Sequence, residues 1–596
     1  MYEKVKRIVE IALSKYLKSK GFHFNVPIRL MKPPDFDMGD YASNIAILLA
    51  EREGRKALEI AKDISSFVED KEGLLAEEPV IAGKGFLNFK IKKERWFSLV
   101  PLLRESGEAL FFPPGSERKK INVEFVSANP TGPLHVGHGR GAVIGDTLVR
   151  LLRATGNEVC AEYYVNDRGK QIRTLGVSLH YRYNKLFNSD FPEPSEEEWY
   201  RGEYLTQIAE ELKKAAGDSL RQKGSHCPEF SRFASKMLED KIREDLAALD
   251  INFDRWFYES SITDSILWGN INYLIEKGFA VKNEDDSISF KMEGFELADP
   301  KERILVKKGG RDFTYFGTDI SYHLDKISRG FDKLINIWGA DHHGYIPRMK
   351  GALKAFGYDP EILKVILVQM VSLSRDGQPI KMSKRSGEFV TLREIVDEVG
   401  KDAFRLIFLM RRPDSQFDFD IEEAKKRSLH NPVYHVQYGH ARLCSILNRA
   451  KEKMAINIDE ISKNRIPDLL MEKLTLEEEV TILRESLKLS DVVNDSVRTF
   501  EPHRVATFIM DLSKMLQSYY TQRWRVYKDP ILPPDSIMGS SSDWKNSWDM
   551  EKTMARLIWA DSIREVFRTS LNLLGVSAPE RMESPAETEI EEEDKA

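Results

Sequence analysis

The segment from residue 121 to residue 165 constrains the fold of this chain most strongly. Residues 121–126 alternate like a strand, and a loop rich in Asn, Pro, Thr and Gly follows them. A helix is predicted for residues 141–153 and a second strand for residues 159–165. A strand, a helix and a strand in this order form a βαβ unit, which implies a parallel sheet with a right-handed crossover. A ligand is expected beyond the carboxyl ends of such strands, where the loop after residue 126 lies.

The rest of the chain is predicted to form further domains around this unit. The fold class is α/β, with a Rossmann-type parallel-sheet domain at residues 115–424 that carries a helical insertion at about 180–250. Residues 1–95 are predicted to form a small N-terminal α/β domain, and residues 425–582 an all-helical C-terminal domain. Residues 583–596 are acidic, contain no aromatic residue and are predicted to be a disordered tail.

Composition narrows the class of protein. At 596 residues the chain is too long for a single hydrophobic core and should hold about three or four domains. Its three cysteines, Cys160, Cys227 and Cys444, are scattered, which excludes a disulfide framework and a CxxC zinc site and favours a reducing cytoplasm. No segment has the ~18 uninterrupted apolar residues of a membrane span. The formal net charge of −6 means that a polyanionic partner would have to meet local basic patches.

The loop after the first strand holds two prolines, two glycines and two histidines within residues 129–138. Its glycine lets a base or a phosphate approach the main chain, and the helix that follows offers unpaired N–H groups to phosphate. The two imidazoles can bond phosphate oxygens and favour a more negative transition state. The predicted ATP-binding and catalytic residues of this loop are Asn129, Pro130, Thr131, Gly132, Pro133, Leu134, His135, Val136, Gly137 and His138.

Three other interpretations of this loop compete. The histidines could simply cap and brace the turn, which is the common role of an isolated HxxH. They could form a metal pair, although no third ligand or cysteine lies nearby in the sequence. Gly137, Gly139 and Ala142, followed by Glu162, also approximate a dinucleotide-binding fingerprint. That fingerprint requires its first glycine directly after the strand, and here about ten residues intervene.

A second segment carries mobile positive charge. Lys381, Met382, Ser383, Lys384 and Arg385 follow a turn and precede a glycine. Flexible ammonium groups suit a leaving pyrophosphate, and the flanking glycines predict a loop that closes over ATP. A KxxKR cluster alone is usually a solvated surface. It indicates ATP binding here only because the histidine loop lies upstream in the same predicted sheet domain.

Together the two segments resemble the nucleotide-binding motifs of the class I aminoacyl-tRNA synthetases. The residues around them are similar to the bacterial-type arginyl-tRNA synthetases over residues 1–582. The segments that carry this resemblance are 123–135, 162–167, 338–345, 431–438 and 574–582. Two departures are Val136, where many class I enzymes have isoleucine, and Arg385, where serine is usual. Both catalytic lysines are retained, and the tail after Met582 lies beyond the resemblance.

The resemblance implies attachment of L-arginine to tRNA(Arg) in two steps. The arginine carboxylate attacks the α-phosphate of ATP, and the 2′-hydroxyl of the terminal adenosine then takes the aminoacyl group. His135, His138, Lys381 and Lys384 are the implied catalytic residues. ATP is expected with Mg²⁺, and neither zinc nor another protein-bound metal is expected. Unlike most class I enzymes, the arginyl family characteristically needs tRNA for the activation step. The family also suggests a cytoplasmic monomer without membrane contact.

The predicted arginine pocket also has a basis in chemistry. A guanidinium must meet carboxylates or hydroxyls in a planar geometry, and Tyr315 and Asp319 lie one helical turn apart. By resemblance Glu124 and Asn129 hold the α-amino end, with His135 nearby. Tyr315, Asp319 and His342 line the side-chain end. The alternative is that Asp319 caps a helix and Tyr315 packs in the core.

Contacts with tRNA are expected from two domains. The helical C-terminal region resembles the anticodon-binding bundle of the family, and the N-terminal module resembles the one that contacts the outer corner of tRNA. Residues 425–427 are basic, and Trp524 and Tyr527 suit base stacking. Competing functions are a cysteinyl-type synthetase, a catalytically silent tRNA-binding relative and a dinucleotide-dependent oxidoreductase. The first would be expected to show a cysteine-rich zinc site, and the second to lack one of the catalytic histidines or lysines.

Overall fold

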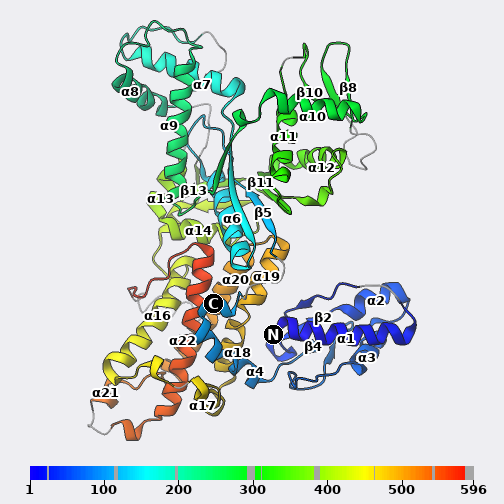
Figure 1. Cartoon of the computed structure of the whole chain (residues 1–596). Helices are drawn as coiled ribbons and strands as arrows, with labels where there is room; N and C mark the ends of the chain where they lie inside the picture. Colours follow the sequence, from blue (N-terminus) through cyan, green and yellow to red (C-terminus); the bar gives the residue numbers. More distant parts are fainter. Residues whose placement is uncertain are drawn as a thin grey trace.

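A five-stranded parallel sheet lies at the centre of the computed structural model (Figure 1). The strand order is β12-β11-β5-β6-β7 and every neighbouring pair is parallel, which agrees with the predicted βαβ unit. The strands are β5 (Lys120–Glu124), β6 (Glu158–Val165), β7 (Arg255–Tyr258), β11 (Lys333–Gly339) and β12 (Leu363–Val368). The structure describes residues 1–22, 26–112, 118–194, 199–291, 302–310, 312–380, 390–461, 463–539 and 544–583.

The crossover between β5 and β6 is helix α6 (Val136–Ala154). The prediction of its start at residue 141 was wrong, because the helix already begins at Val136 with His135 as its N-cap. The glycines and prolines before residue 141 looked like a loop, but glycines inside α6 serve close packing instead. A Cβ atom at Gly145 would lie 2.3 Å from Cγ of Phe125, so only glycine lets the helix rest on the end of β5.

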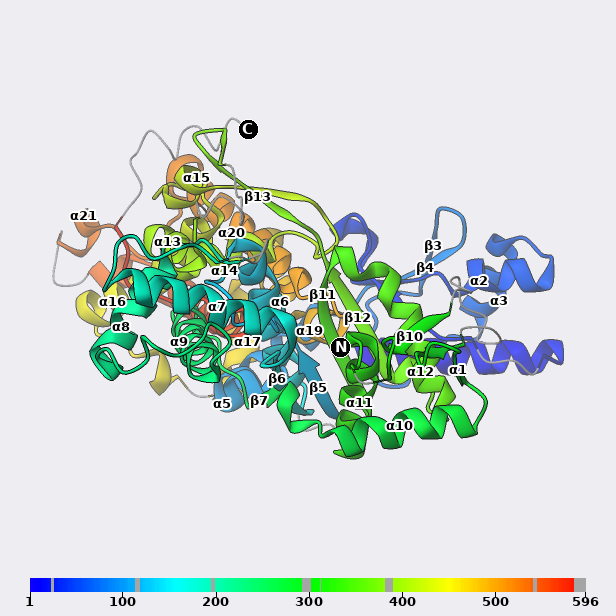
Figure 2. The ribbon, with the colours of Figure 1, turned by 90° about the horizontal axis from the view of Figure 1, so that it is seen from above.

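Two lobes flank the carboxyl end of the sheet on opposite sides (Figures 1 and 2). One is helical and has its own apolar core around Leu179 and Phe230, and it contains α7 (Gly169–Lys185), α8 (Tyr204–Ala216) and α9 (Pro228–Ala247). The other packs helices on a three-stranded antiparallel sheet around a second core. Its elements are α10 (Asp264–Glu276), β8 (Ala280–Lys282), β9 (Ile288–Phe290), β10 (Arg303–Val306), α11 (Tyr315–Ser328) and α12 (Ile346–Ala355).

After β12 the chain forms a second small sheet, of order β14-β13-β15. Strand β13 pairs antiparallel with β14 and parallel with β15. The elements of this region are β13 (Val371–Arg375), β14 (Gln378–Ile380), α13 (Leu392–Val399), α14 (Lys401–Leu409), β15 (Phe417–Asp420) and α15 (Ile421–Lys425).

The N-terminal module is a four-stranded antiparallel sheet of order β1-β2-β4-β3 packed with helices. It meets the C-terminal helices through buried charges, because Asp40 Oδ1 lies 3.2 Å from Arg484 Nε and 3.6 Å from Lys488 Nζ. Its elements are α1 (Tyr2–Lys20), β1 (Leu30–Met31), β2 (Tyr41–Ser43), α2 (Ile45–Glu53), α3 (Ala57–Ser66), β3 (Val80–Ala82) and β4 (Phe86–Phe89), and α4 (Lys93–Phe97) and α5 (Leu99–Ser106) follow.

The C-terminal part is a helical bundle. Two apolar stripes face its core, since Ile509 and Leu512 of one helix and Ile563 and Phe567 of another are buried. Its helices are α16 (Pro432–Met454), α17 (Ile466–Lys473), α18 (Glu477–Ser486), α19 (Leu489–Thr499), α20 (His503–Thr521), α21 (Asp535–Met538) and α22 (Met550–Leu574).

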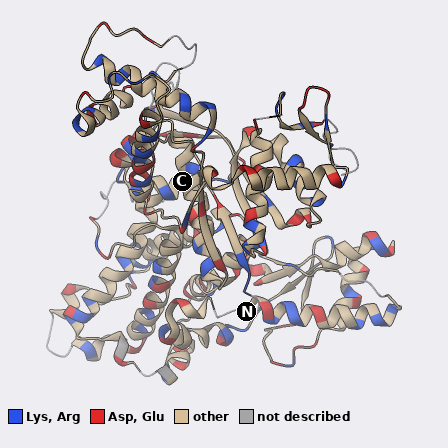
Figure 3. Cartoon of the chain, turned by 45° about the horizontal axis from the view of Figure 1, so that its top comes forward, with Lys and Arg blue, Asp and Glu red and all other residues tan. Residues whose placement is uncertain are grey.

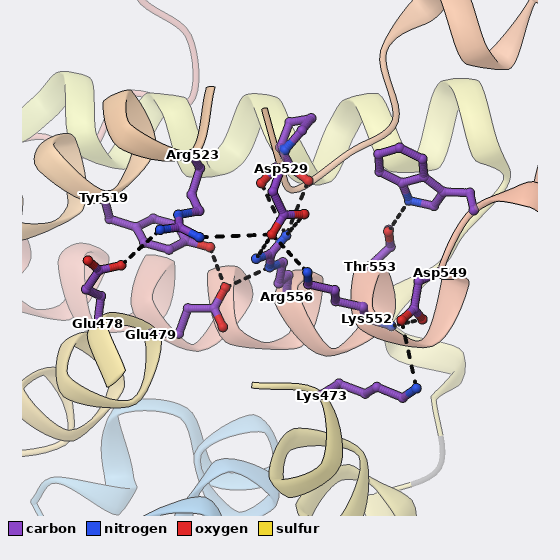
Figure 4. Close-up of polar contacts among 12 residues, drawn as sticks. Lys473, Glu478, Glu479, Tyr519, Arg523, Asp529, Asp549, Lys552, Thr553 and Arg556 are labelled. Atoms are coloured by element: carbon purple, nitrogen blue, oxygen red, sulfur yellow. Dashed lines mark hydrogen bonds and ion pairs between the residues drawn. The ribbon is translucent and has the colours of Figure 1, made fainter. Parts of the chain in front are cut away.

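The bundle also buries a network of charges (Figure 4). The guanidinium of the buried Arg556 donates to Glu479 Oε1 at 2.7 Å and to Asp529 at 3.0 and 2.9 Å. The Tyr519 hydroxyl donates to the same oxygen of Glu479 at 2.7 Å. Burial raises the pKa of Asp529, but hydrogen bonds from Arg556 and Lys552 outweigh it and bring this pKa down to about 2. These pairs hold the segment after α20 against α22.

The surface carries both signs of charge side by side. Acidic and basic residues alternate along α9 and α1 (Figure 3), in keeping with the formal net charge of −6. Within the described ranges, no helix is long and apolar enough to cross a membrane. Tyr527 is exposed, as a stacking surface would require, whereas the Trp524 side chain lies outside the described residues. Residues 584–596 of the predicted acidic tail also lie outside them.

Candidate active site

The loop after β5 adopts a strained backbone. Val126 has φ of 68° and Ser127 has φ of 42°, which is the left-handed region that a β-branched residue rarely enters. The turn is held by Ser127 Oγ, which donates to Glu124 Oε1 at 3.0 Å and accepts from the backbone N–H of Tyr164 at 3.2 Å. The Tyr163 hydroxyl donates to the Ala128 carbonyl at 2.8 Å. Such strain often accompanies functional sites, where surrounding contacts hold it in place.

The two histidines lie at the N-terminus of α6. Their rings stack with centroids 3.7 Å apart, and the His135 backbone N–H donates to His138 Nδ1 at 3.2 Å. His138 therefore braces the first turn, as one of the alternatives proposed, but this contact uses only Nδ1. Because Nδ1 accepts, the neutral ring carries its proton on Nε2, which can donate to an anion. A Cβ atom at Gly137 would come within 3.1 Å of the His135 ring, so glycine allows this arrangement.

A cavity of about 1220 Å³ opens at the carboxyl edge of the sheet, beside this loop. The prediction that the ligand site lies beyond the carboxyl ends of the strands agrees with this position. The cavity is walled by the histidine segment, by α7, by residues 199–204 and by the ends of β11 and β12. The predicted residues that line it are Asn129, Thr131, Gly132, Pro133, His135, Gly137, His138 and His342.

The loop that meets the cavity is also anchored by neighbouring helices. Asn129 Nδ2 donates to Gln171 Oε1 of α7 at 2.6 Å, and the Tyr204 hydroxyl donates to the Thr131 carbonyl at 2.7 Å. The helical insertion therefore shapes the same loop as the sheet does. Sequence reasoning missed Gln171 and Tyr204, because nothing in their local pattern indicates that they contact this loop.

The lysine segment is not part of the chain that the structure describes. Lys381, Met382, Ser383 and Lys384 all fall within residues 381–389, outside the described residues. Its two ends are described. β14 ends at Ile380, and the Leu392 backbone N–H donates to the Leu134 carbonyl at 2.8 Å. The chain therefore returns from the lysine segment directly beside the histidine segment.

Asp319, within α11, lies near two other carboxylates, Glu124 on β5 and Glu259 after β7. The Tyr345 hydroxyl donates to Asp319 Oδ2 at 2.6 Å. Burial raises the pKa of Asp319 to about 7, the Tyr345 hydrogen bond opposes this rise, and the charges of Glu124 and Glu259 add to it. Burial also raises the pKa of Glu259. Asn166 Nδ2 lies 3.1 Å from Glu259 Oε2. A cluster of desolvated carboxylates of this kind is suited to a guanidinium.

The remaining predicted side chains take different positions. Tyr315 is the first residue of α11, with Thr314 as its cap, and its side chain is exposed. The alternative in which Asp319 caps the helix and Tyr315 fills the core is therefore wrong. His342 is exposed at the cavity, 3.6 Å from Asp341. Glu124 on β5 and Tyr315 and Asp319 on α11 are not among the described residues that line the cavity.

Comparisons with known proteins agree with this geometry. Three family models match consecutive parts of the chain. They are the arginyl tRNA synthetase N terminal domain (residues 3–91), the catalytic domain of class I (R) tRNA synthetases (residues 106–426) and the DALR anticodon binding domain (residues 436–582). An arginine–tRNA ligase of Syntrophotalea carbinolica is 39% identical over 98% of this chain and 100% of its own length. The chain belongs to the arginyl-tRNA synthetase family.

Other members of the family show the same relation. The arginine–tRNA ligase of Aquifex aeolicus is 39% identical over 96% of this chain and all of its own length. A solved structure of a putative arginyl-tRNA synthetase from Campylobacter jejuni superposes with a TM-score of 0.70 at 32% identity, over 83% of this chain and 100% of that chain. The Thermus thermophilus arginyl-tRNA synthetase shares the fold, with a TM-score of 0.69 at 20% identity over 97% of this chain and 100% of that chain.

Tyr345 and Glu259 are two further residues near Asp319 that were not predicted from the sequence. Tyr345 lies inside one of the segments that carried the resemblance, so its sequence position was a usable signal. Glu259 had none, because it follows β7 in an ordinary Glu-Ser-Ser sequence and only the fold brings it near Asp319. Among described side chains no group of three or more His, Cys, Asp or Glu is arranged to hold a metal ion.

Proposed function

We propose that this chain attaches L-arginine to tRNA(Arg), using ATP and releasing AMP and pyrophosphate. The observation that carries the proposal is the stacked His135–His138 pair at the N-terminus of α6, on the wall of a cavity at the carboxyl edge of a parallel sheet. That edge is where such sheets bind nucleotides. The carboxylates of Glu124, Asp319 and Glu259 interact with one another, and we place the amino acid of the adenylate beside them.

The ATP end of the site is proposed to be formed by residues 129–138. The N–H groups of the first turn of α6 and the Nε2–H of His138 face the phosphates, where they stabilise the charge that grows as the α-phosphate is attacked. Lys381 and Lys384, with Met382 and Ser383 between them, are proposed to reach the leaving pyrophosphate from the other side. This assignment is supported by the return of the chain at Leu392 beside Leu134.

The part of the site that holds arginine is proposed to contact both the α-amino end and the guanidinium end of the substrate. Glu124 and Asn129 take the α-amino end, close to His135. Asp319 and Glu259 meet the guanidinium, with Tyr315 and His342 closing the pocket when substrate is present. Two carboxylates suit the planar fork of a guanidinium better than the single point charge of lysine.

Mg²⁺ is proposed to arrive with the triphosphate. Mg²⁺ in such sites is bound through substrate phosphates and one or two carboxylates rather than by a dedicated cage. Asp341 is the carboxylate among the described lining residues, so this donor set fits an ion held mainly by ATP. When bound, the ion neutralises phosphate charge, while the residues of the chain orient the reactants.

The tRNA is proposed to span the other domains. Residues 425–582 form the anticodon-binding part, and residues 1–95 contact the outer corner of tRNA. We further propose that the protein acts as a cytoplasmic monomer. Residues 583–596 receive no role.

The decisive experiment is pyrophosphate–ATP exchange with each of the twenty amino acids, with and without tRNA. We expect exchange only with arginine in the presence of tRNA(Arg). Exchange driven by another amino acid would refute the proposed specificity. Exchange without tRNA would refute only the tRNA requirement.

A single substitution tests the role of the lysine segment. Lys381→Ala should lower turnover by about a hundredfold or more, because it removes a charge from the transition state, while the Kd for tRNA stays nearly unchanged. Lys354→Ala, at the end of α12, is the matched control and should leave turnover unchanged. An equal loss of tRNA affinity in Lys381→Ala would show that this loop binds tRNA instead.

A further inference from the structure

Helix α11 presents a row of polar side chains to the central sheet. Asp319, Tyr322, Lys326 and the C-cap residue Arg329 recur at intervals of three or four residues, so they lie along one face. Tyr322 and Lys326 are fully buried. A polar row buried against a sheet is costly unless each member has a partner, and here each member has one.

Lys326 is bonded directly to the carboxylate proposed to hold the substrate's α-amino group. Its Nζ donates to Glu124 Oε2 at 2.6 Å and to Asn336 Oδ1 at 3.1 Å, and it lies 4.4 Å from the centre of the Tyr322 ring. Glu124 Oε1 accepts from Ser127 Oγ at 3.0 Å. The carboxylate is therefore fixed through both oxygens, one toward α11 and the other toward the strained loop.

The same contacts lead back to Asp319. Asn336 Nδ2 lies 2.9 Å from His323 Nε2, and His323 Nδ1 lies 2.8 Å from the Asp319 carbonyl. Burial, together with the charge of Lys326, lowers the pKa of His323 to about 3, so this ring is neutral. Its Nε2 accepts from the Asn336 amide, and its Nδ1–H donates to the Asp319 carbonyl. Lys326, Asn336 and His323 thus join Glu124 to the backbone of Asp319.

A second ion pair fixes the far end of the helix. Arg329 donates to both oxygens of Glu162, at 2.6 and 2.9 Å, and the Tyr322 hydroxyl donates to Glu162 Oε1 at 2.7 Å. Glu162 on β6 is the register partner of Glu124 on β5. Two cations of one helix therefore hold two adjacent strands, which prevents α11 from sliding along the sheet.

We propose that Lys326 is a positioning residue that sets the length of amino acid the pocket accepts. This inference rests on the proposed function, in which Glu124 meets the α-amino group and Asp319 meets the guanidinium. Asp319 lies two helical turns before Lys326, about 10 Å along the axis. Because the ion pair with Glu124 fixes the helix, the two carboxylates keep one separation, so the pocket should discriminate between arginine and an analogue with one more methylene.

The test compares L-arginine with L-homoarginine, which is longer by one methylene, in tRNA-dependent exchange. Lys326→Met keeps the length of the side chain and removes its charge. We expect the KM for arginine to rise at least tenfold and the KM for ATP to stay within about twofold. The ratio of kcat/KM for arginine to that for homoarginine should fall at least tenfold. Lys350→Met is the matched control, since it removes a different Lys–Glu pair, between Lys350 of α12 and Glu361, and should change none of these values.

A second variant keeps the test valid if Lys326→Met does not fold. Asn336→Ala leaves the Lys326–Glu124 pair in place and removes the link to His323, so the arginine-to-homoarginine ratio should fall severalfold. Equal rises in both KM values, or an unchanged ratio in both variants, would overturn the inference. A wild-type protein without arginine-dependent exchange would overturn the proposed function itself, which is a different result.

Discussion

Single residues of this site owe their chemistry to where the fold buries them. Asp319 is the clearest case, because its sequence position one helical turn after Tyr315 indicates a partner for a guanidinium but says nothing of its charge. In the fold its pKa is raised to about 7, chiefly by burial. Asp319 therefore holds a proton below that pH, and a guanidinium that pairs with its carboxylate, as proposed for arginine, would displace that proton.

This shift predicts a pH dependence of arginine binding. Because the pKa of the Asp319 carboxyl group is raised, the population of its charged form, which we propose binds the guanidinium, grows as the pH rises through about 7. We expect the KM for arginine to fall by up to about tenfold per pH unit below 7 and to level off above it. Steady-state exchange from pH 6 to pH 8.5, with saturating ATP and tRNA, measures this.

Tyr345→Phe sharpens that test. The hydroxyl of Tyr345 lowers the pKa of Asp319, so its removal should move the midpoint of the profile to higher pH. Tyr358→Phe, at an exposed tyrosine of the same lobe, should leave the midpoint in place. A midpoint that stays or falls in Tyr345→Phe would contradict the assignment to Asp319.

His138 combines two roles that substitution can separate. In His138→Asn the amide oxygen can still accept from the His135 N–H, but the Nε2–H that we propose faces the phosphates is lost. We expect near wild-type thermal stability and an exchange rate lower by about a hundredfold to a thousandfold. His138→Ala should lose the same activity and about 1 kcal/mol of stability as well, because it also removes the cap. An active His138→Asn variant would leave bracing as the only role.

At the scale of elements, α6 works because glycine lets its neighbours come close. A Cβ atom at Gly139 would lie 2.5 Å from Leu392 Cδ1 and 2.6 Å from Phe404 Cζ, whereas one at Gly141 would meet nothing within 4 Å. Leu392 begins α13, directly after the lysine segment. The packing at Gly139 therefore decides where that segment returns to the site.

The two glycines give a matched pair of variants. Gly139→Ala should cost about 1–3 kcal/mol of unfolding free energy through overpacking and should lower the exchange rate, because α13 is displaced. Gly141→Ala should instead stabilise the protein by about 0.5–1 kcal/mol through better helix propensity. Denaturant unfolding followed by exchange measures both. Equal stability of the two variants would show that Leu392 and Phe404 give way without cost.

At the scale of the whole molecule, one buried arginine joins the catalytic sheet to the helical bundle. Arg405 on α14 donates to Asp146 Oδ2 at 2.6 Å, to the Leu249 carbonyl at 3.0 Å and to the Leu574 carbonyl at 2.9 Å. It is fully buried. The end of α22 is thereby held to the helix that packs on α6, so the bundle is part of the support of the site.

Loss of this arginine should uncouple the domains. Arg405→Met leaves the Leu249 and Leu574 carbonyls without the arginine donor and Asp146 Oδ2 with Arg150 as its remaining partner, and should cost about 3 kcal/mol. We expect two separated transitions in scanning calorimetry where the wild type shows one, because the bundle no longer unfolds together with the sheet. Arg393→Met, at an exposed pair with Asp397, should give the wild-type trace. A single unshifted transition in Arg405→Met would show that other contacts join the domains.

Local patterns in the sequence were sufficient to predict the parallel sheet and the family. Strand alternation, helical spacing and turn residues act over a few neighbours, so they can be recognised in the sequence. The start of α6 could not be recognised in this way. Its glycines signal a loop locally, and only their contacts with Phe125 and Leu392 make them part of a helix.

What the sequence determined by itself was therefore the order of the elements and the types of side chain available at the site. The tertiary structure decided which of them meet and in what charge state. Lys326 pairs with Glu124 across 202 residues. The pKa of Asp319 is raised by burial and by the nearby carboxylates of Glu124 and Glu259. Desolvation and long-range charge depend on distances in the folded protein, which adjacent residues in a sequence do not encode.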